Sequence, residues 1–168
     1  MKILLMRHAE AMDRNPKKFP DDQLRTITKT GQKRTEEAAH ALAKMEQRVD
    51  LVLSSPLTRT QQTANIMRKG LHLSKERLAL TDFLAPLGDL DALVEQMRKM
   101  DPFSTLLLVG HEPELGELIS ILLSGDRTLQ IEIKKGSICC LTADELTAGK
   151  CATLEWLLTP GQLSRLYQ

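Results

Sequence analysis

Short apolar runs alternate along this chain with longer segments in which apolar residues recur at helical spacing. Strand-like runs cover residues 3–6, 51–53 and 106–109, and each is apolar throughout, as strands covered on both faces of a sheet are. Helical stripes lie between and after these runs. Strand and helix in alternation build a largely parallel sheet with helices on both faces. The sequence therefore predicts an α/β fold, a three-layer α/β/α sandwich.

The C-terminal part of the chain departs from this alternation. Two strand-like runs, residues 138–141 and 153–158, are separated by residues 143–152, which show no helical pattern. A hairpin fits them, so we expect at least one antiparallel strand in the mostly parallel sheet. A chain of 168 residues can bury a sizeable core without metal or disulfide support, and we expect a single domain spanning residues 1–168.

Charge and cysteine usage limit the partners that we expect. The formal net charge of +1 is too small to indicate a nucleic-acid or membrane partner. Cys139, Cys140 and Cys151 lack metal-ligand spacing, and we interpret them as small hydrophobic residues in a reducing compartment. The first residues do not form a secretory signal pattern. We expect a cytoplasmic protein whose specificity for anions, if any, is local.

Basic side chains follow the first three strand-like runs. Arg7 and His8 end the first run, Arg59 follows the second, and His111 follows the third. Ligands of open α/β sheets bind at the carboxyl ends of the strands, so these four side chains are expected to meet. Arginine forks and protonated histidines match the oxygens of a tetrahedral oxyanion. The sequence therefore predicts a phosphate site built from side chains.

Neighbouring segments add to this prediction. Pro56 and Pro113 are expected in the first turns of helices, whose N-termini favour anions. The loop-like stretch 13–24 closely follows His8 and could lie over the site. The chain has no Cys-x5-Arg loop, no cysteine near the cluster and no carboxylate arrangement that suggests metal hydrolysis. Histidine is left as the candidate nucleophile, because neutral imidazole accepts phosphoryl groups.

Three sequence blocks resemble motifs of the histidine phosphatase superfamily, which has the phosphoglycerate mutase-like fold. The blocks are LMRHAE at 5–10, SSPLTRTQQTA at 54–64 and VGHEP at 109–113. The short chain and the segment RTITKTG at 25–31 are similar to the small SixA-type phosphohistidine phosphatases. This resemblance runs from Lys2 to about Leu158. It implies a metal-independent phosphatase that needs no cofactor and acts on phosphohistidine in a phosphorylated protein.

The resemblance also implies a role for each matching residue. His8 would be the nucleophile that is transiently phosphorylated. Arg7, Arg59 and His111 would bind the phosphoryl oxygens and stabilise the transition state. Arg25 would lie at the rim of the pocket and contribute to phosphate binding.

The chain departs from the superfamily pattern in two places. Ala9 stands where glycine is usual, which is tolerable if the backbone there keeps φ negative. No clear proton donor follows the second helix, where Asp82 and Asp89 are the available carboxylates, and Glu112 stands beside the second histidine. An alkoxide leaving group needs a proton, whereas a protonated phosphoimidazole leaves as a neutral ring. A weak or missing acid therefore favours a phosphohistidine substrate.

Two other functions stay open from the sequence. One is a phosphatase or mutase that acts on a small phosphorylated metabolite, a phosphomonoester. The other is a phosphate-binding module that recognises its ligand without turnover.

Overall fold

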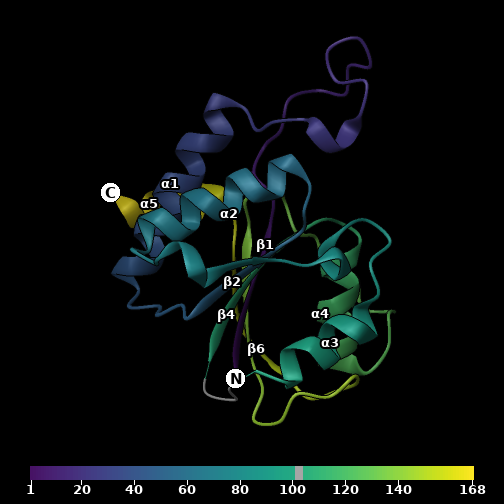
Figure 1. The fold of residues 1–168 in the computed structure, drawn as a ribbon. Helices are drawn as coiled ribbons and strands as arrows, with labels where there is room; N and C mark the ends of the chain where they lie inside the picture. Colours follow the sequence, from purple (N-terminus) through teal and green to yellow (C-terminus); the bar gives the residue numbers. More distant parts are fainter. Residues whose placement is uncertain (101–103) are drawn as a thin grey trace.

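The computed structural model describes residues 1–100 and 104–168, and its strands form one sheet in the order β3-β2-β4-β1-β5-β6 (Figure 1). The strands are β1 (Lys2–Arg7), β2 (Leu51–Ser54), β3 (Leu78–Leu80), β4 (Thr105–Gly110), β5 (Ile138–Thr142) and β6 (Thr153–Leu158). The α-helices are α1 (Lys29–Lys44), α2 (Thr58–Gly70), α3 (Leu90–Arg98), α4 (Glu114–Ser124) and α5 (Pro160–Tyr167). Short 3-10 helices are η1 (Asp22–Leu24), η2 (Lys75–Arg77) and η3 (Asp82–Leu84).

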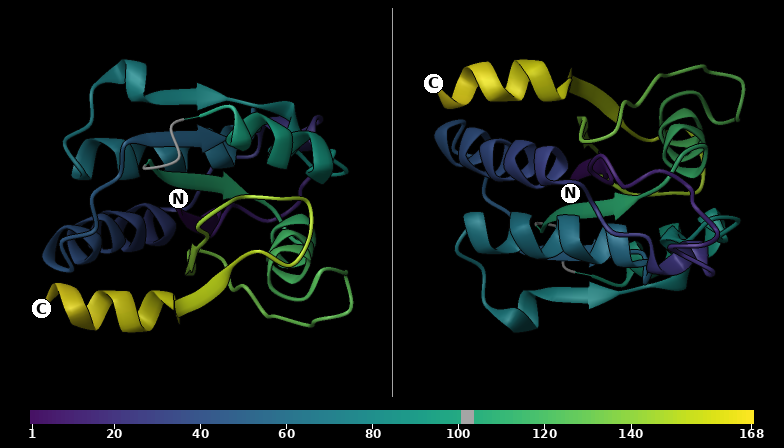
Figure 2. Two further views of the ribbon diagram at one scale, coloured as in Figure 1. Left: turned by 90° about the horizontal axis from the view of Figure 1, so that it is seen from below. Right: turned by 90° about the horizontal axis from the view of Figure 1, so that it is seen from above.

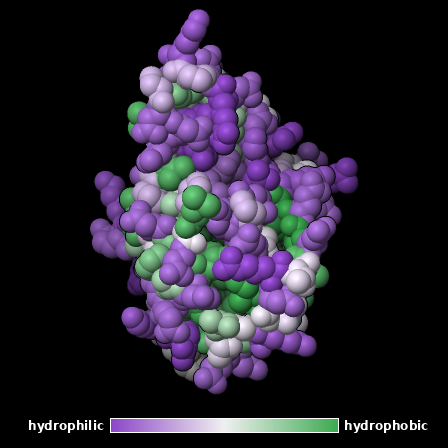
Figure 3. All heavy atoms as spheres, turned by 90° about the vertical axis from the view of Figure 1, so that its right-hand side faces the viewer, coloured by the Kyte–Doolittle hydropathy of each residue, from purple (hydrophilic) through white to green (hydrophobic). Residues whose placement is uncertain are grey.

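Helices cover both faces of the sheet, as Figures 1 and 2 show. Helices α1, α2 and α5 pack on one face, and α3 and α4 pack on the other. The predicted three-layer α/β/α sandwich is confirmed. Seen from the side of α3 and α4, the surface carries hydrophobic patches separated by hydrophilic side chains (Figure 3). None of the helices in the described residues is long and apolar enough to cross a membrane.

The strand β1 shows why the first predicted run is apolar throughout. Ile3 and Leu5 belong to the core beneath α3 and α4. Leu4 and Met6 alternate with them and belong to the core beneath α1, α2 and α5. All four side chains are fully buried. Both faces of the strand are covered, so no position along it faces water.

Strand directions decide which chain segments meet at the site. β1, β2, β3 and β4 are parallel, whereas β5 pairs antiparallel with both β1 and β6, so the predicted hairpin is confirmed. In the register of the sheet, Arg7 lies opposite Gly110, and Ser54 lies opposite Val109. The carboxyl ends of β1, β2 and β4 therefore share one edge.

Two expectations about local structure need correction. Strand β3 was not predicted, because its three residues are partly or largely exposed at the edge of the sheet and form no buried run. The two prolines lie outside the first helical turns: Pro56 precedes the N-cap Leu57 of α2, and Pro113 is itself the N-cap of α4. Arg59 is nevertheless the second residue of α2, so it lies at a helix N-terminus as expected.

Candidate active site

A pocket of about 440 Å³ lies at the carboxyl edge of the sheet. It brings together the four side chains expected there from the ends of three strands, namely Arg7, His8, Arg59 and His111. Arg25 and Glu112, which were weaker candidates, also line it. Residues far apart in the sequence thus meet because their strands are parallel neighbours.

His8 continues the line of β1 by one residue. Its backbone N–H donates to the carbonyl of Gly110 at 3.1 Å, and its side chain is buried. The ring Nδ1 lies 2.7 Å from the carbonyl oxygen of Ala9. A carbonyl oxygen only accepts hydrogen bonds, so Nδ1 carries the proton and Nε2 keeps its lone pair. Burial, and then the charges of Arg59 and Arg7, lower the pKa of His8 to about 4, so the ring is neutral at pH 7.

Ala9 fits the place where glycine is usual in the superfamily. It does not adopt a positive φ, which was the condition for tolerating a side chain there. Its backbone N–H donates to Oγ1 of Thr63 at 3.1 Å, while its carbonyl holds His8. The backbone of this residue orients the histidine, and the small methyl group is buried beside it.

His111 follows β4 and faces His8. Its Nε2 lies 2.9 Å from Oγ of Ser55, and the centroids of the two imidazole rings are 5.2 Å apart. Burial, and then the proximity of His8 and Arg59, lower the pKa of His111 to about 3. With these lowered pKa values both rings are neutral near pH 7 in the free protein, so the arginines, rather than the protonated histidines considered from the sequence, supply the positive charge. A bound phosphoryl group would raise both pKa values by favouring the charged rings.

Arg7 and Arg59 are held in the same manner. Nη1 of Arg7 donates to the carbonyl of Ile133 at 2.9 Å, and Nη1 of Arg59 donates to the carbonyl of Asp22 at 3.1 Å. The Nε atom of each arginine is buried and has no hydrogen-bond partner in the described part of the chain. In a planar guanidinium, Nε and Nη2 form a two-donor edge that matches two phosphate oxygens. Both arginines are therefore anchored through Nη1 with this edge unused.

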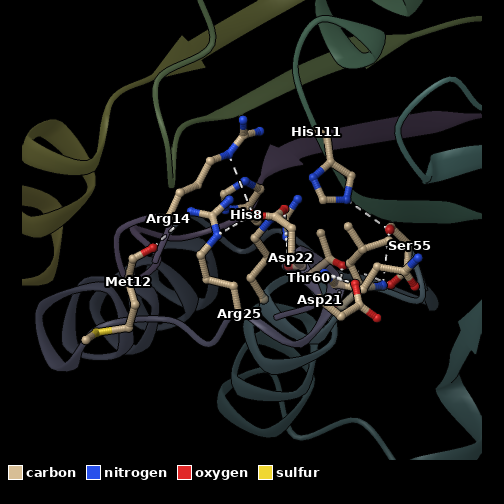
Figure 4. A network of polar contacts seen from close by, with 12 residues as sticks. His8, Met12, Arg14, Asp21, Asp22, Arg25, Ser55, Thr60 and His111 are labelled. Atoms are coloured by element: carbon tan, nitrogen blue, oxygen red, sulfur yellow. Dashed lines mark hydrogen bonds and ion pairs between the residues drawn. The ribbon is translucent and has the colours of Figure 1, made fainter. Parts of the chain in front are cut away.

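Asp22, from the loop that follows β1, lies among the arginines of the pocket (Figure 4). Its Oδ1 is 3.0 Å from Nε of Arg25, and its Oδ2 is 3.2 Å from Nη1 of Arg59. Arg25 also donates from Nη1 to the carbonyl of Met12 at 2.9 Å. Although burial opposes it, the hydrogen bond and charge of Arg25 lower the pKa of Asp22, with help from Arg59. The loop thus supplies an ionised carboxylate.

The three carboxyl groups considered as proton donors occupy different places. Asp82 is exposed at the start of η3, and Asp89 is exposed and caps α3 by accepting from the N–H of Ala92. Of the three, Glu112 alone lines the pocket. Its Oε1 is buried without a hydrogen-bond partner among the described residues. Burial, opposed by the charge of Arg7, raises the pKa of Glu112 to about 7, so it can hold a proton near neutral pH.

Sequence reasoning missed several residues of the site. Asp22 and Arg14 come from the loop over residues 13–24, which was expected near the site without any residue being singled out. Lys135 lines the pocket because the antiparallel β5 begins at the same edge where β1 ends. Ser55 belongs to the second motif and contacts His111. The predicted hairpin was the one signal that could have pointed to Lys135.

The pocket can hold a tetrahedral anion next to an unprotonated imidazole nitrogen. Two arginine edges and a set of further basic side chains supply the positive charge. Within the described residues, His, Cys, Asp and Glu side chains form no group of three that could hold a metal ion.

Comparison with known proteins gives a consistent result. The family model described as "Histidine phosphatase superfamily (branch 1)" matches residues 3–81. An uncharacterized protein of Picosynechococcus sp. (strain ATCC 27264 / PCC 7002 / PR-6) is 32% identical over 143 residues, which are 82% of this chain and 82% of that protein. Phosphohistidine phosphatase SixA of Escherichia coli (strain K12) is 25% identical over 166 residues, 97% of this chain and 96% of that protein. The solved structure of the protein histidine phosphatase SixA complexed with tungstate superimposes with a TM-score of 0.83 at 24% identity, covering 97% of this chain and 99% of that one.

Proposed function

The chain belongs to the histidine phosphatase superfamily, and on that premise we propose that this phosphatase removes the phosphoryl group from phosphohistidine in a protein partner. The catalytic groups that we assign are His8 as nucleophile and Arg7, Arg59 and His111 as ligands of the phosphoryl oxygens. No metal or other cofactor takes part in the proposed reaction. We place the reaction in the cytoplasm.

In the first step, Nε2 of His8 attacks the phosphorus atom. The Nε2–P bond forms while the bond between phosphorus and the substrate nitrogen breaks, and the bonding pair goes to that nitrogen. Arg7 and Arg59 each present an unused edge formed by Nε and Nη2, and the two guanidinium groups compensate the charge on the transferred oxygens. A substrate imidazole whose other nitrogen is protonated leaves as a neutral ring.

In the second step, water attacks the phosphorus atom of phosphorylated His8. The P–Nε2 bond breaks and its pair returns to Nε2, while the hydroxyl group and the proton of water both end on the released dihydrogen phosphate. The proton that Nδ1 shares with the carbonyl of Ala9 stays in place throughout. The ring therefore departs as neutral imidazole, and His8 needs no separate acid to act as a leaving group.

The hydrogen bond from His8 Nδ1 to Ala9 is the observation that carries this proposal. It fixes the tautomer that a nucleophilic Nε2 requires, in a pocket whose two anchored arginines keep an unused edge. A module that only binds phosphate would have no need of a fixed tautomer. The match to SixA at 25% identity, which runs over nearly the whole of both chains, supports phosphohistidine as the substrate.

Glu112 favours a second candidate function. A carboxyl group with a pKa of about 7 that lines the pocket is suited to protonate an alkoxide. A small phosphomonoester is therefore the alternative substrate.

A substrate panel decides between the two. We expect higher kcat/KM for a protein that carries phosphohistidine than for phosphoserine or other small monoesters. A preference for small monoesters by tenfold or more would reject the phosphohistidine proposal and leave the alternative. Failure to form a phosphorylated His8 with any substrate would reject both.

A further inference from the structure

We propose that Asp22 is a positioning residue for the phosphoryl site, because it holds Arg59 through Nη1 and leaves the edge formed by Nε and Nη2 unused. This proposal rests on the proposed phosphatase function. It assigns a role to the loop over residues 13–24, which the resemblance to the superfamily left without one.

Asp22 contacts Arg59 in two ways. Its backbone carbonyl accepts a hydrogen bond from Nη1 of Arg59 at 3.1 Å, and its carboxylate Oδ2 lies 3.2 Å from the same nitrogen. The side chain of Arg59 is 6% exposed, so water cannot replace these partners easily. Both contacts fall on Nη1, which leaves Nε and Nη2 free to form the two-donor edge. The anchor therefore determines which edge of the guanidinium a phosphoryl group meets.

Arg7 provides an internal comparison. It is anchored through Nη1 too, but its partner is the neutral carbonyl of Ile133. Only the anchor of Arg59 includes a charge. The charged anchor stands where other cations gather, because the charges of Arg25 and Arg14 both act on Arg59.

The charge of Asp22 is shared by three guanidinium groups. Besides Arg59, Arg25 lies 3.0 Å from Oδ1 and Arg14 lies 3.6 Å from the same oxygen (Figure 4). Burial and the proximity of Arg25 lower the pKa of Arg59, while Asp22 acts in the opposite sense. Without the carboxylate, these cations would repel one another across the pocket. Asp22 therefore both orients Arg59 and limits that repulsion.

The loop holds Asp22 in a defined position. At its base, the N–H of Met12 donates to the carbonyl of Thr26, and the N–H of Thr28 donates to the carbonyl of Glu10, each at 2.9 Å. Arg25 ties the two sides together by donating to the carbonyl of Met12. Because these hydrogen bonds hold the two ends of the loop together, placing Asp22 at the pocket costs little additional chain entropy.

The test uses Asp22→Asn, with Asp22→Glu as the conservative variant and Asp21→Asn as the matched control. Asp21 is the adjacent carboxylate, which caps η1 through the N–H of Gln23 and contacts no arginine among the described residues. For p-nitrophenyl phosphate, we expect Asp22→Asn to lower kcat about 10- to 100-fold, the effect of misplacing a catalytic group by about 1 Å. We expect KM to change by less than about threefold, since removing a negative charge favours anion binding while misplacing Arg59 opposes it. Asp22→Glu should recover part of kcat, and Asp21→Asn should match the wild type.

Binding of orthovanadate, followed by calorimetry, separates this proposal from the proposed function. Vanadate resembles the transferred group, so Asp22→Asn should weaken its binding even if no physiological substrate is found. A wild type without turnover on any substrate, but with this loss of vanadate affinity, would overturn the function and keep the role of Asp22. Unchanged kcat and vanadate affinity in Asp22→Asn would overturn that role. So would a loss matched by Asp21→Asn, or a loss that accompanies a lower Tm without any split between kcat and KM.

Discussion

The Nδ1 atom of His8 lies 2.7 Å from the carbonyl oxygen of Ala9, the residue that replaces the usual glycine. The contact involves only the backbone of Ala9, so the replacement does not disturb it. It turns the Nε2 atom of His8 into the unprotonated nitrogen of a neutral ring.

Replacing His8 with alanine should abolish phosphoryl transfer. The wild-type protein should trap an acid-labile, base-stable phosphoryl label during turnover, and His8→Ala should trap none, because the accepting nitrogen is gone. His40→Ala is the control, since His40 is exposed on α1 and should retain both label and activity. Label that persists in His8→Ala at the wild-type level would contradict the assignment.

Two arginines on α2 should respond in opposite ways to truncation. Arg59→Ala should lower kcat about 100- to 1,000-fold, as loss of a group that stabilises the transition state does. Its stability should change little, because a cation is removed from a cluster of like charges. Arg68→Ala should retain activity but lower the free energy of unfolding by about 1–3 kcal/mol, because Nη1 of Arg68 donates to the carbonyl of Leu73.

Both predictions are checked by measuring kcat and the free energy of unfolding in urea for Arg59→Ala and Arg68→Ala. Equal losses of activity in the two would show that α2 responds as a whole and would refute a specific role for Arg59.

Glu112 should matter for some leaving groups and not for others. Its pKa of about 7 predicts that hydrolysis of phosphoserine declines as the pH rises through 7, because the carboxyl group must be protonated to donate. Glu112→Gln should lower kcat for phosphoserine about 100-fold and should have a much smaller effect with phosphohistidine. Glu117→Gln, which changes a carboxylate paired with Arg127, serves as the control. The same loss for both substrates in Glu112→Gln would contradict a role as proton donor.

Stability should fall on acidification because of the two buried histidines. The folded pKa values of His8 and His111, about 4 and about 3, lie below the unfolded value of 6.5. Below pH 6.5 the unfolded chain binds protons that the folded chain does not, so the free energy of unfolding decreases as the pH falls, by up to about 1.4 kcal/mol per pH unit for each histidine. Glu112 opposes this between pH 4.5 and about 7, where the folded chain holds the extra proton.

Denaturation from pH 7 to 4.5 measures these slopes. His111→Gln should be less sensitive to acid than the wild type, and Glu112→Gln should be more sensitive. The reverse order would show that the pKa values of these groups are not shifted as described.

The sequence predicted the buried part of the fold because burial leaves a periodic pattern. The strands β1, β2 and β4 have both faces covered, so their apolar runs stand out from the neighbouring helices. β3 escaped prediction because its apolar run is only three residues long and largely exposed at the edge of the sheet, so it does not stand out as a buried strand. The four main site residues could be predicted because they directly follow strands or begin a helix, where the topology alone brings them together.

The electrostatics of the site could not be predicted in the same way. The charge states of His8 and His111 depend on how deeply the folded protein buries each imidazole ring. The residue types that flank the two histidines in the sequence do not reveal this burial. The position of Asp22 depends on how a loop returns to the sheet, and nothing in its local sequence distinguishes it from Asp21. Which candidate proton donor lines the pocket was likewise undecided, since Glu112 and Asp82 are both plausible from their places in the sequence.

The central position of β1 has a consequence for how the molecule assembles during synthesis. Ile3 pairs with Leu106 on one side and with Leu141 on the other, so both neighbours of this strand come from much later in the chain. Contacts this distant in sequence slow folding, because the entropy cost of closing a long loop comes before the contacts stabilise the fold. A nascent chain on the ribosome that stops short of β5 would hold β1 with one unpaired edge, which invites aggregation. His8 thus precedes the other groups of the site in the chain, yet the strand that carries it is among the last to be enclosed.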